Sequence, residues 1–265
     1  MPDPIITLTT DFGEDSPYVA SMKGVILGIN PAARLVDLSH QLPPQNLTHA
    51  AFFLATTVPC FSTEVLHVVV VDPGVGTERA LLYVEVEGHH LLAPDNGCWT
   101  LLARQGSRPP RVLKLVEPRY WRQPVSATFH GRDILAPVAG HLSLGLDPQS
   151  LGPVASEWVQ LEFPVPALEP DRLAGEVIFV DHYGNLITNI PGDAFHALAA
   201  GPVRVAVGSQ EVARRVRTYG EAEPGTFVAL ISSAGMLEIA VVQGNAARLM
   251  CARPGTPVVA ERREM

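Results

Sequence analysis

Short apolar runs alternate with segments of helical spacing along the first 160 residues of the chain. Five apolar runs typical of buried strands lie at 4–10, 35–38, 65–71, 80–87 and 89–93. Segments with helical spacing lie at 17–29, 49–56, 97–102 and 134–142. The runs are rich in β-branched residues, which favour extended structure. Strands that alternate with helices predict an α/β domain with a mostly parallel sheet.

Polar residues stand where several of these helices should begin. Ser16 is expected to cap the first helix, with Pro17 in its first turn, and Asn46 is expected to cap the second. Asp95 and Asp133 also precede segments of helical spacing. A helix cap is therefore one interpretation of each of these two aspartates.

The pattern changes after a proline-punctuated stretch at 163–170. Short strands are then expected at 174–180, 185–190, 203–207, 226–232, 236–242 and 256–260. A single helix is expected after Pro191-Gly192-Asp193. The sequence therefore predicts an α/β domain over residues 1–162, a linker over 163–172 and a mainly β domain over 173–265.

Composition narrows the possible classes of protein. The chain has 265 residues, of which 47% are hydrophobic and 17% charged, as in a compact globular protein. Its net charge of −8 argues against a nucleic-acid partner, because phosphates require clusters of Lys and Arg. The run Arg214-Arg215-Val216-Arg217 is too short to provide such a cluster and is expected to be a solvated face.

Cysteine usage and hydropathy indicate a cellular compartment. Cys60, Cys98 and Cys251 form no CxxC pair and have apolar neighbours, so we expect three buried structural thiols. The chain shows no signal peptide and no apolar run near the roughly 18 residues that span a bilayer. We therefore expect a cytoplasmic protein without a membrane partner.

Acidic residues follow three of the apolar strands of the first domain. Asp11, Asp72 and Asp95 each come directly after a run with strand character. Ligands of open α/β sheets bind beyond the carboxyl ends of the strands. We therefore expect these aspartates to converge on one edge of the sheet and to form part of a site.

Two segments carry an acid, a cation and a titratable base. Asp72 and Arg79 flank a glycine-rich segment that lacks the Gly-Lys-Ser/Thr ending of a phosphate-binding P-loop. His130 lies in the segment Thr128 to Asp133, at the next turn before a helix. A connecting turn and a structural histidine remain the alternatives. Together the three side chains can hold and activate a small nucleophile such as water.

Two segments of the second domain are also candidate ligand contacts. Asp181, Asn185 and Asn189 lie near a predicted turn and can bind an amine, a carboxylate or a purine edge, although Gly184-Asn185 also suits a plain hairpin. Glu238 lies in an apolar run that follows a turn of small residues. Strand alternation places Glu238 either on a solvent face or in contact with a ligand.

Motifs for other chemistries are missing from the sequence. There is no HExxH, no histidine-rich cluster and no Gly-x-Ser-x-Gly nucleophile elbow. We therefore expect no structural metal. A metal-dependent hydrolase that uses the strand-end aspartates with His130 stays open as an alternative.

Six motifs, taken together and in order, resemble a known family. They span Thr9 to Gly13, Asp72 to Arg79, Ala93 to Gly97, Thr128 to Asp133, Asp181 to Asn189 and Ser233 to Val241. In this order they resemble the S-adenosylmethionine (SAM) hydroxide adenosyltransferases, which are relatives of the bacterial fluorinase and chlorinase. The resemblance implies hydrolysis of SAM by water to adenosine and L-methionine without a cofactor. It also implies a barrel-like second domain and a homotrimer with its sites at subunit interfaces.

The resemblance also assigns site residues. Asp72, Arg79 and His130 match the family's catalytic triad, in which the acid and the imidazole would orient water and accept its proton. Asp11 matches the aspartate that contacts adenosine, and Asp181 matches a contact to the methionine part. The remaining matches to substrate contacts are Asn185, Ser233, Glu238 and the backbone at Val241.

The related halogenases provide the main alternative function. By this resemblance the fluorinase has tyrosine at the position of Asp72, and tyrosine and serine at those of His130 and Gly131. A halide needs a neutral, hydrogen-bonding pocket, and a carboxylate would repel it. Asp72 therefore favours water over a halide. An adenosyl-halide synthase and a non-catalytic protein that binds SAM or adenosine remain the alternatives.

Overall fold

The computed structural model describes residues 3–212 and 214–263 of the chain. The chain divides into two compact units, Met1–Leu161 and Glu162–Met265. The boundary falls at the start of the proline-punctuated stretch. Each unit has its own core, and each is described separately below.

Unit 1 is an α/β domain built on one mixed sheet, with strand order β2-β1-β3-β5-β4-β6. Its strands are β1 (Ile5–Thr10), β2 (Arg34–Ser39), β3 (Leu66–Val70), β4 (Leu81–Val86), β5 (His89–Pro94) and β6 (Arg111–Lys114). Its α-helices are α1 (Pro17–Ile29), α2 (Leu47–Thr57), α3 (Thr100–Gln105) and α4 (Ala136–Ser143). Short 3₁₀ turns lie at Val58–Cys60, Pro118–Tyr120 and Pro148–Leu151, and a π-helical turn at Gly131–Leu135 leads into α4.

The sheet is parallel at its centre and antiparallel at one side. β1 pairs in parallel with β2 and β3, and β3 pairs in parallel with β5. β4 is antiparallel to both β5 and β6. Glu87 and Gly88 join β4 to β5 and both have positive φ, which is the geometry of a tight hairpin turn. A two-residue loop cannot carry a parallel crossover, so the mostly parallel sheet predicted from the sequence has an antiparallel side.

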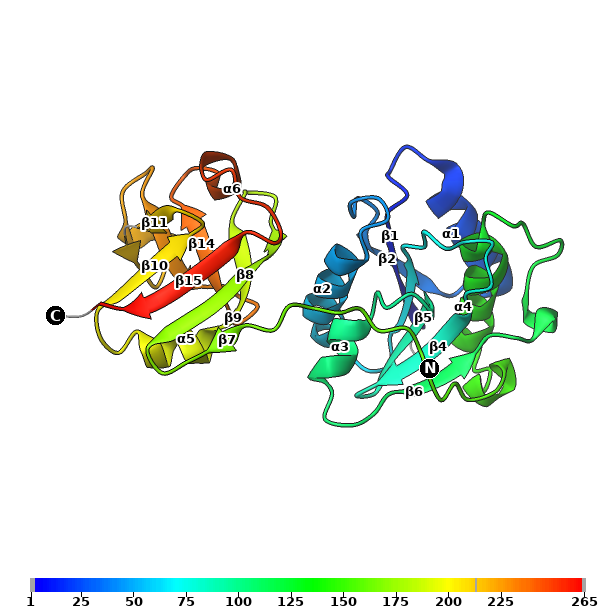
Figure 1. The fold of residues 1–265 in the computed structure, drawn as a ribbon. Helices are drawn as coiled ribbons and strands as arrows, with labels where there is room; N and C mark the ends of the chain where they lie inside the picture. The colour runs from blue at the N-terminus through cyan, green and yellow to red at the C-terminus, as the bar shows by residue number, and fades with distance from the viewer. Residues whose placement is uncertain (1–2, 213, 264–265) are drawn as a thin grey trace. The chain divides into compact units, whose positions relative to one another are not determined.

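Helices cover both faces of this sheet (Figure 1). Val68 and Val70 of β3 belong to the core that includes residues of α1 and α4. Val69, between them, belongs to the core that includes residues of α2 and α3. Successive strand residues point to opposite faces, so the continuous apolar run of β3 fills two cores at once.

The expected helix caps are found in part. Asn46 Oδ1 accepts a hydrogen bond from the His49 backbone N–H at 2.9 Å, so Asn46 caps α2 as predicted. Ser16 occupies the N-cap position of α1, but its side chain makes no capping hydrogen bond. Asp95 is not a cap, because α3 begins five residues later, at Thr100.

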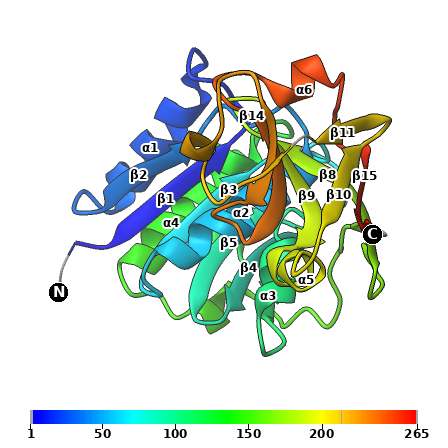
Figure 2. The same ribbon diagram turned by 90° about the vertical axis from the view of Figure 1, so that its left-hand side faces the viewer.

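Unit 2 is the mainly β domain that the sequence predicted. Its sheet follows the order β11-β10-β15-β8-β9-β14-β13-β12 and curls into a nearly closed, barrel-like form, in which β8 and β9 lie side by side (Figure 2). Its strands are β7 (Ala167–Leu168), β8 (Arg172–Val180), β9 (Leu186–Pro191), β10 (Val203–Val207), β11 (Gln210–Val212), β12 (Arg214–Arg215), β13 (Phe227–Ile231), β14 (Met236–Val241) and β15 (Pro257–Arg262). Its helices are α5 (Gly192–Leu198) and α6 (Ala246–Leu249), with a 3₁₀ turn at Tyr219–Glu221.

The cysteines differ from the expectation in two of three cases. Cys98 is buried, and burial raises the pKa of its thiol to about 12, with the charge of Asp72 adding to the effect. Cys60 and Cys251 are exposed, so the prediction of three buried thiols was wrong. Cys60 ends a surface 3₁₀ turn and Cys251 has a positive φ in a turn, and apolar sequence neighbours do not bury a side chain in such turns.

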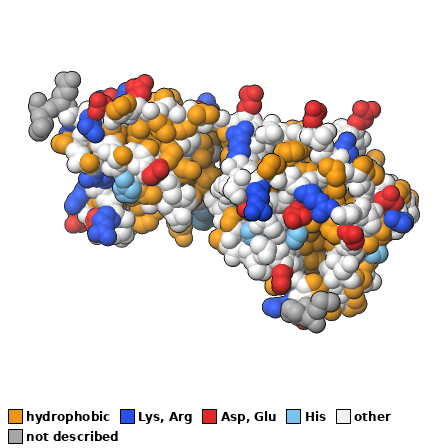
Figure 3. Space-filling view, turned by 90° about the horizontal axis from the view of Figure 1, so that it is seen from below, with side chains coloured by type: hydrophobic (Ala, Val, Ile, Leu, Met, Phe, Trp, Pro, Cys, Tyr) orange, Lys and Arg blue, Asp and Glu red, His pale blue; other side chains and the backbone are white. Residues whose placement is uncertain are grey.

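No helix among the described residues is long and apolar enough to cross a membrane. On the face drawn in Figure 3, acidic and basic side chains lie interspersed among apolar ones. Arg214 and Arg215, from the short basic run, are exposed in β12, as expected for a solvated face.

Candidate active site

Three aspartates follow neighbouring strands of the unit 1 sheet. Asp11 follows β1, Asp72 follows β3 and Asp95 follows β5, and these strands are parallel and adjacent. Thr10 lies opposite Val70 in the register, so the ends of β1 and β3 are level. The carboxyl ends of the three strands therefore share one edge of the sheet, as the sequence pattern indicated.

Arg79 joins Asp72 to His130 in a continuous hydrogen-bonded chain. Its Nε donates to Asp72 Oδ1 and Oδ2 at 3.0 and 2.9 Å, and its Nη2 donates to Oδ2 at 2.5 Å. The same Nη2 lies 2.8 Å from His130 Nδ1. The side chains of Asp72 and Arg79 are only 7% and 10% exposed, so their attraction is little screened by water. The sequence placed these three residues in one site, and the structure brings them into contact.

The glycines of the 72–79 segment make this contact possible. Gly76 has a φ of +80°, and a Cβ at this position would lie 2.4 Å from the carbonyl oxygen of Ala127. Only glycine combines this backbone conformation with so close an approach. The segment therefore rests directly on the loop that precedes His130, and it is more than a connecting turn.

The hydrogen bond from Arg79 determines which nitrogen of His130 carries the proton. A guanidinium group can only donate, so His130 Nδ1 must accept. The neutral ring then carries its hydrogen on Nε2. Burial and the positive charge of Arg79 both lower the pKa of His130 below its usual value. His130 is therefore a neutral imidazole that offers an Nε2–H donor at neutral pH.

The backbone around His130 is packed tightly against the centre of unit 1. A Cβ on Gly131 would meet Val70 Cγ1 at 3.2 Å and Met22 Sδ at 3.3 Å. The π-helical turn at Gly131 thus lies against the end of β3, two residues before Asp72. The preceding residue, Phe129, is buried and packs edge-to-face against Tyr18, with ring centroids 5.1 Å apart. Both contacts fix the position of His130.

The other two strand-end aspartates have different surroundings. Asp11 Oδ2 accepts a hydrogen bond from the Gln45 backbone N–H at 2.7 Å, and Oδ1 has no hydrogen-bond partner among the described residues. Asp11 thus keeps one oxygen available for a ligand hydroxyl. Asp95 Oδ1 accepts from the Val159 backbone N–H at 2.8 Å and so secures the chain near the end of unit 1.

Asp181 and Asn185 of unit 2 are joined by two hydrogen bonds at the turn between β8 and β9. Asn185 donates its backbone N–H to Asp181 Oδ1 at 2.8 Å and its side-chain amide to Oδ2 at 2.9 Å. The segment is therefore a hairpin that also presents a carboxylate. Asn189 has a structural role, since its side chain accepts from the Glu176 N–H and donates to the Pro164 carbonyl.

Glu238 is buried and bonded to a residue that the sequence did not indicate. It is 5% exposed, and Tyr219 donates its hydroxyl to Glu238 Oε1 at 2.5 Å. The solvent-face alternative was wrong, because β14 lies between β9 and β13 with nearly all of its residues buried. Burial raises the pKa of Glu238. Tyr219 lies in a 3₁₀ turn without any pattern around it, so no sequence signal marked it.

Ser233 and Val241 lie at opposite ends of β14. Ser233 is exposed in the turn before the strand. Val241 ends the strand with a buried side chain, and its carbonyl accepts from the Gly244 N–H at 3.0 Å. Their contact with a substrate stays a prediction.

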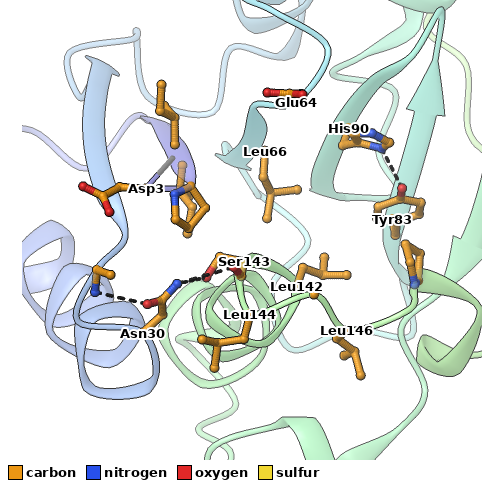
Figure 4. A pocket seen from close by; sticks show the side chains of 16 residues that line it. Asp3, Asn30, Glu64, Leu66, Tyr83, His90, Leu142, Ser143, Leu144 and Leu146 are labelled. Carbon is orange, nitrogen blue, oxygen red and sulfur yellow. Dashed lines mark hydrogen bonds between the residues drawn. The ribbon is translucent and has the colours of Figure 1, made fainter. Parts of the chain in front are cut away.

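A cavity of about 520 Å³ lies at the other end of the unit 1 sheet (Figure 4). Residues at the start of β1 and β3 line it, together with leucines that follow α4. Tyr83 and His90, 2.6 Å apart, and Asn30 and Ser143, 2.8 Å apart, are hydrogen-bonded in its wall. The triad is not part of this wall, because Asp72 follows the end of β3 and the cavity lies at the start of that strand. Among the described residues, no three His, Cys, Asp or Glu side chains are grouped to hold a metal ion.

Two family models match the sequence of the chain. The SAM hydroxide adenosyltransferase N-terminal domain matches residues 6–152, and the corresponding C-terminal domain matches residues 175–259. The chain belongs to the SAM hydroxide adenosyltransferase family. The resemblance inferred from the six ordered motifs is thereby confirmed.

Individual relatives place this family member nearer to the hydrolases than to the halogenases. A Salinispora arenicola protein named (R)-S-adenosyl-L-methionine hydrolase is 37% identical over 254 residues. The match covers 95% of this chain and 95% of that protein. A fluorinase of Nocardia brasiliensis is 25% identical and covers 89% of this chain and 90% of its own. The crystal structure of an uncharacterized conserved protein from Thermotoga maritima is 35% identical, with a TM-score of 0.91 over 97% of this chain and 100% of that one.

Proposed function

We propose that this protein hydrolyses S-adenosyl-L-methionine to adenosine and L-methionine, by attack of water on the ribose C5′. The observation that carries the proposal is the chain from Asp72 through Arg79 to His130, at the ligand-binding edge of the sheet. The sequence similarity to proteins named (R)-S-adenosyl-L-methionine hydrolase supports the choice of substrate.

The reaction requires the protein to act on the nucleophile. SAM is a sulfonium cation, and breaking the bond between C5′ and sulfur releases a neutral thioether, so the leaving group needs no acid. Water must instead be aligned opposite this bond and must lose a proton. Fixed alignment alone can lower the barrier by several kcal/mol.

The tautomer of His130 separates the roles of the triad. His130 Nε2–H donates to the water oxygen and orients it, because Nδ1 is already engaged by Arg79. The proton acceptor is then Asp72, whose Oδ1 has one hydrogen bond and retains accepting capacity. Arg79 holds both partners in place. This assignment refines the sequence-based hypothesis, in which the acid and the imidazole both accepted the proton.

The remaining candidate residues bind the substrate in this proposal. Asp11 accepts hydrogen bonds from the ribose hydroxyls, which its free Oδ1 permits. Asp181 contacts the methionine part. The further substrate contacts proposed for unit 2 are Asn185, Ser233, Glu238 and the backbone at Val241. No cofactor takes part in this proposal, since attack of water on the sulfonium releases a neutral thioether without further help.

We further propose that the protein acts in the cytoplasm as a homotrimer, with each site completed by a neighbouring subunit. The free thiols of the described residues support a reducing compartment. Mixing inactive Asp72→Ala and Asp181→Ala chains after dissociation tests the shared site. Reassembly should restore about a quarter of the wild-type activity, because only one in four adjacent pairs combines two intact halves. Failure to restore activity in reassembled trimers would refute a site shared between subunits.

An assay on the purified protein tests the function directly. SAM is incubated with the protein in the presence of EDTA, and adenosine and methionine are separated by chromatography. Both products should appear in equal amounts, and loss of activity with EDTA would favour a metal-dependent hydrolase. Parallel reactions with chloride or fluoride test for a halogenated adenosine. Binding of SAM without any product would identify a non-catalytic binding protein.

A further inference from the structure

Asp133 is a fully buried carboxylate three residues after His130. It is 0% exposed and does not cap a helix, because it lies inside the π-helical turn Gly131–Leu135. Its Oδ1 accepts from Arg122 Nη1 at 3.0 Å and from Arg132 Nε at 2.7 Å. Its Oδ2 accepts from Arg132 Nη2 at 2.7 Å and from the Ser126 backbone N–H at 2.9 Å. The helix-cap interpretation of Asp133 was therefore wrong.

These bonds close the loop that carries His130. The Arg122 backbone N–H also donates to the Asp133 carbonyl at 2.8 Å, and the Asp133 N–H donates to the Phe129 carbonyl at 3.1 Å. Asp133 is thereby hydrogen-bonded to the start of this loop at Arg122, to its middle at Ser126 and to its end at Phe129. The middle of this loop contains Ala127, whose carbonyl meets Gly76 of the triad segment.

The charges around Asp133 keep it ionised in the interior. Burial alone would raise the pKa of its carboxyl, but the hydrogen bonds from Arg132, Ser126 and Arg122 outweigh burial and lower it. Arg132 is itself held in place, with its guanidinium carbon 4.9 Å from the centre of the Phe129 ring. A buried carboxylate that is kept charged by arginines is a costly way to gain stability, and the best-supported use of such a group is to fix one arrangement of the chain.

We propose that Asp133 is a positioning residue, which holds loop 122–130 so that His130 Nδ1 faces Arg79. The proposal rests on the proposed function, because it assigns Asp133 a part in orienting the attacking water. Asp133 does not touch Asp72 or Arg79, so its effect on the reaction passes through the loop and through His130. The neighbouring Arg122 shares this role from the surface, since its side chain is 47% exposed.

Three variants of the full-length protein test the proposal. Asp133→Asn removes the charge that accepts hydrogen bonds from the loop, and Arg122→Ala removes the exposed side chain that donates one of these bonds. Arg119→Ala is the matched control, because Arg119 lies on the same segment and is 64% exposed. Among the described residues it pairs only with Glu117 and the Tyr120 ring. For Asp133→Asn we expect kcat to fall at least about 10-fold with little change in KM, since a small misplacement of a reacting group is costly. Arg122→Ala should show a smaller fall of the same kind.

The ring nitrogens of His130 provide a readout that general destabilisation does not change. ¹⁵N NMR of the wild type should show a neutral ring protonated at Nε2. The two loop variants, measured at 10 °C where they are folded, should show a mixture of tautomers. Unchanged kcat and an unchanged tautomer in both variants would overturn the proposal. If Asp133→Asn does not fold, Arg122→Ala decides alone by the same two measurements. If the wild type itself produces no adenosine, the proposed function fails instead, and the tautomer still reports whether Asp133 positions His130.

Discussion

Arg79 Nη2 and His130 Nδ1 lie 2.8 Å apart, and this contact assigns the imidazole a donor role. An acid–cation–base set in sequence suggests that the histidine removes a proton from water. The observed order, with Arg79 between Asp72 and His130, leaves the imidazole without an accepting nitrogen toward the substrate. In the proposed reaction, Asp72 is therefore the proton acceptor and His130 is the group that orients water.

Replacing Arg79 should raise the pKa of His130 toward its usual value of about 6.5, because one of the two causes that lower it is removed. Arg79→Gln removes the charge, whereas Arg79→Lys keeps the charge and loses the planar fork that reaches both partners. We expect kcat to fall about 100-fold or more in both variants. Titration of His130 by NMR should show a raised pKa in Arg79→Gln and a smaller rise in Arg79→Lys. An unchanged His130 titration in Arg79→Gln would contradict the described contact.

Asp72→Asn should abolish most turnover while leaving the shape of the site intact. The amide cannot accept a proton from water, and loss of a positioned base typically costs about 10²–10⁴ in rate. Substrate affinity should change little, because in the proposed reaction Asp72 contacts the attacking water and not the substrate. Single-turnover kinetics and calorimetric titration with SAM measure the two effects separately. Equal turnover by Asn and Asp at this position would remove Asp72 from the chemistry.

Asp11→Asn should weaken binding of SAM and adenosine to a similar degree. The variant can keep the hydrogen bond from the Gln45 N–H, so the local backbone should be preserved. It loses the charge that strengthens a hydrogen bond from a ribose hydroxyl, which is worth about 1 kcal/mol or more and predicts a Kd roughly 5- to 10-fold higher. Methionine binding should be unaffected and serves as the control. A selective effect on SAM alone would place Asp11 away from the ribose.

The sequence predicts the strand ends of unit 1 well and the contacts between side chains poorly. Asp11, Asp72 and Asp95 were placed on one edge because the direction of parallel strands follows from the alternation of elements. Apolar periodicity also located the long strands of unit 2, whereas β7, β11 and β12 are too short to have a period.

The unpredicted contacts depend on how distant segments fold together. Tyr219 meets Glu238 from a separate turn, and Asp133 gathers donors from a loop whose path no local pattern encodes. Burial of Glu238 likewise depends on the neighbours of β14 and not on alternation within it. Local sequence rules describe one element at a time and do not include such pairings.

His67 should make the protein less stable as the pH falls below about 6.5, the usual pKa of histidine. It is 0% exposed, its Nδ1 is bonded to Thr7 Oγ1 at 2.8 Å, and its Nε2 has no hydrogen-bond partner among the described residues. Burial, together with His89 and His90, lowers the pKa of His67 to about 4. The folded protein therefore favours the neutral ring, whereas the unfolded chain takes up a proton between the two pKa values.

The contribution of His67 to the free energy of unfolding is complete above pH 6.5 and is lost as the pH falls toward 4. Linkage gives a loss of roughly 2 kcal/mol between pH 7.5 and 5. Urea unfolding at both pH values measures it, with His67→Gln compared against His182→Gln, a histidine exposed in the turn after β8. His182→Gln should lose as much stability as the wild type, and His67→Gln should lose roughly 2 kcal/mol less. Equal losses in the wild type and in His67→Gln would show that acid acts on other groups.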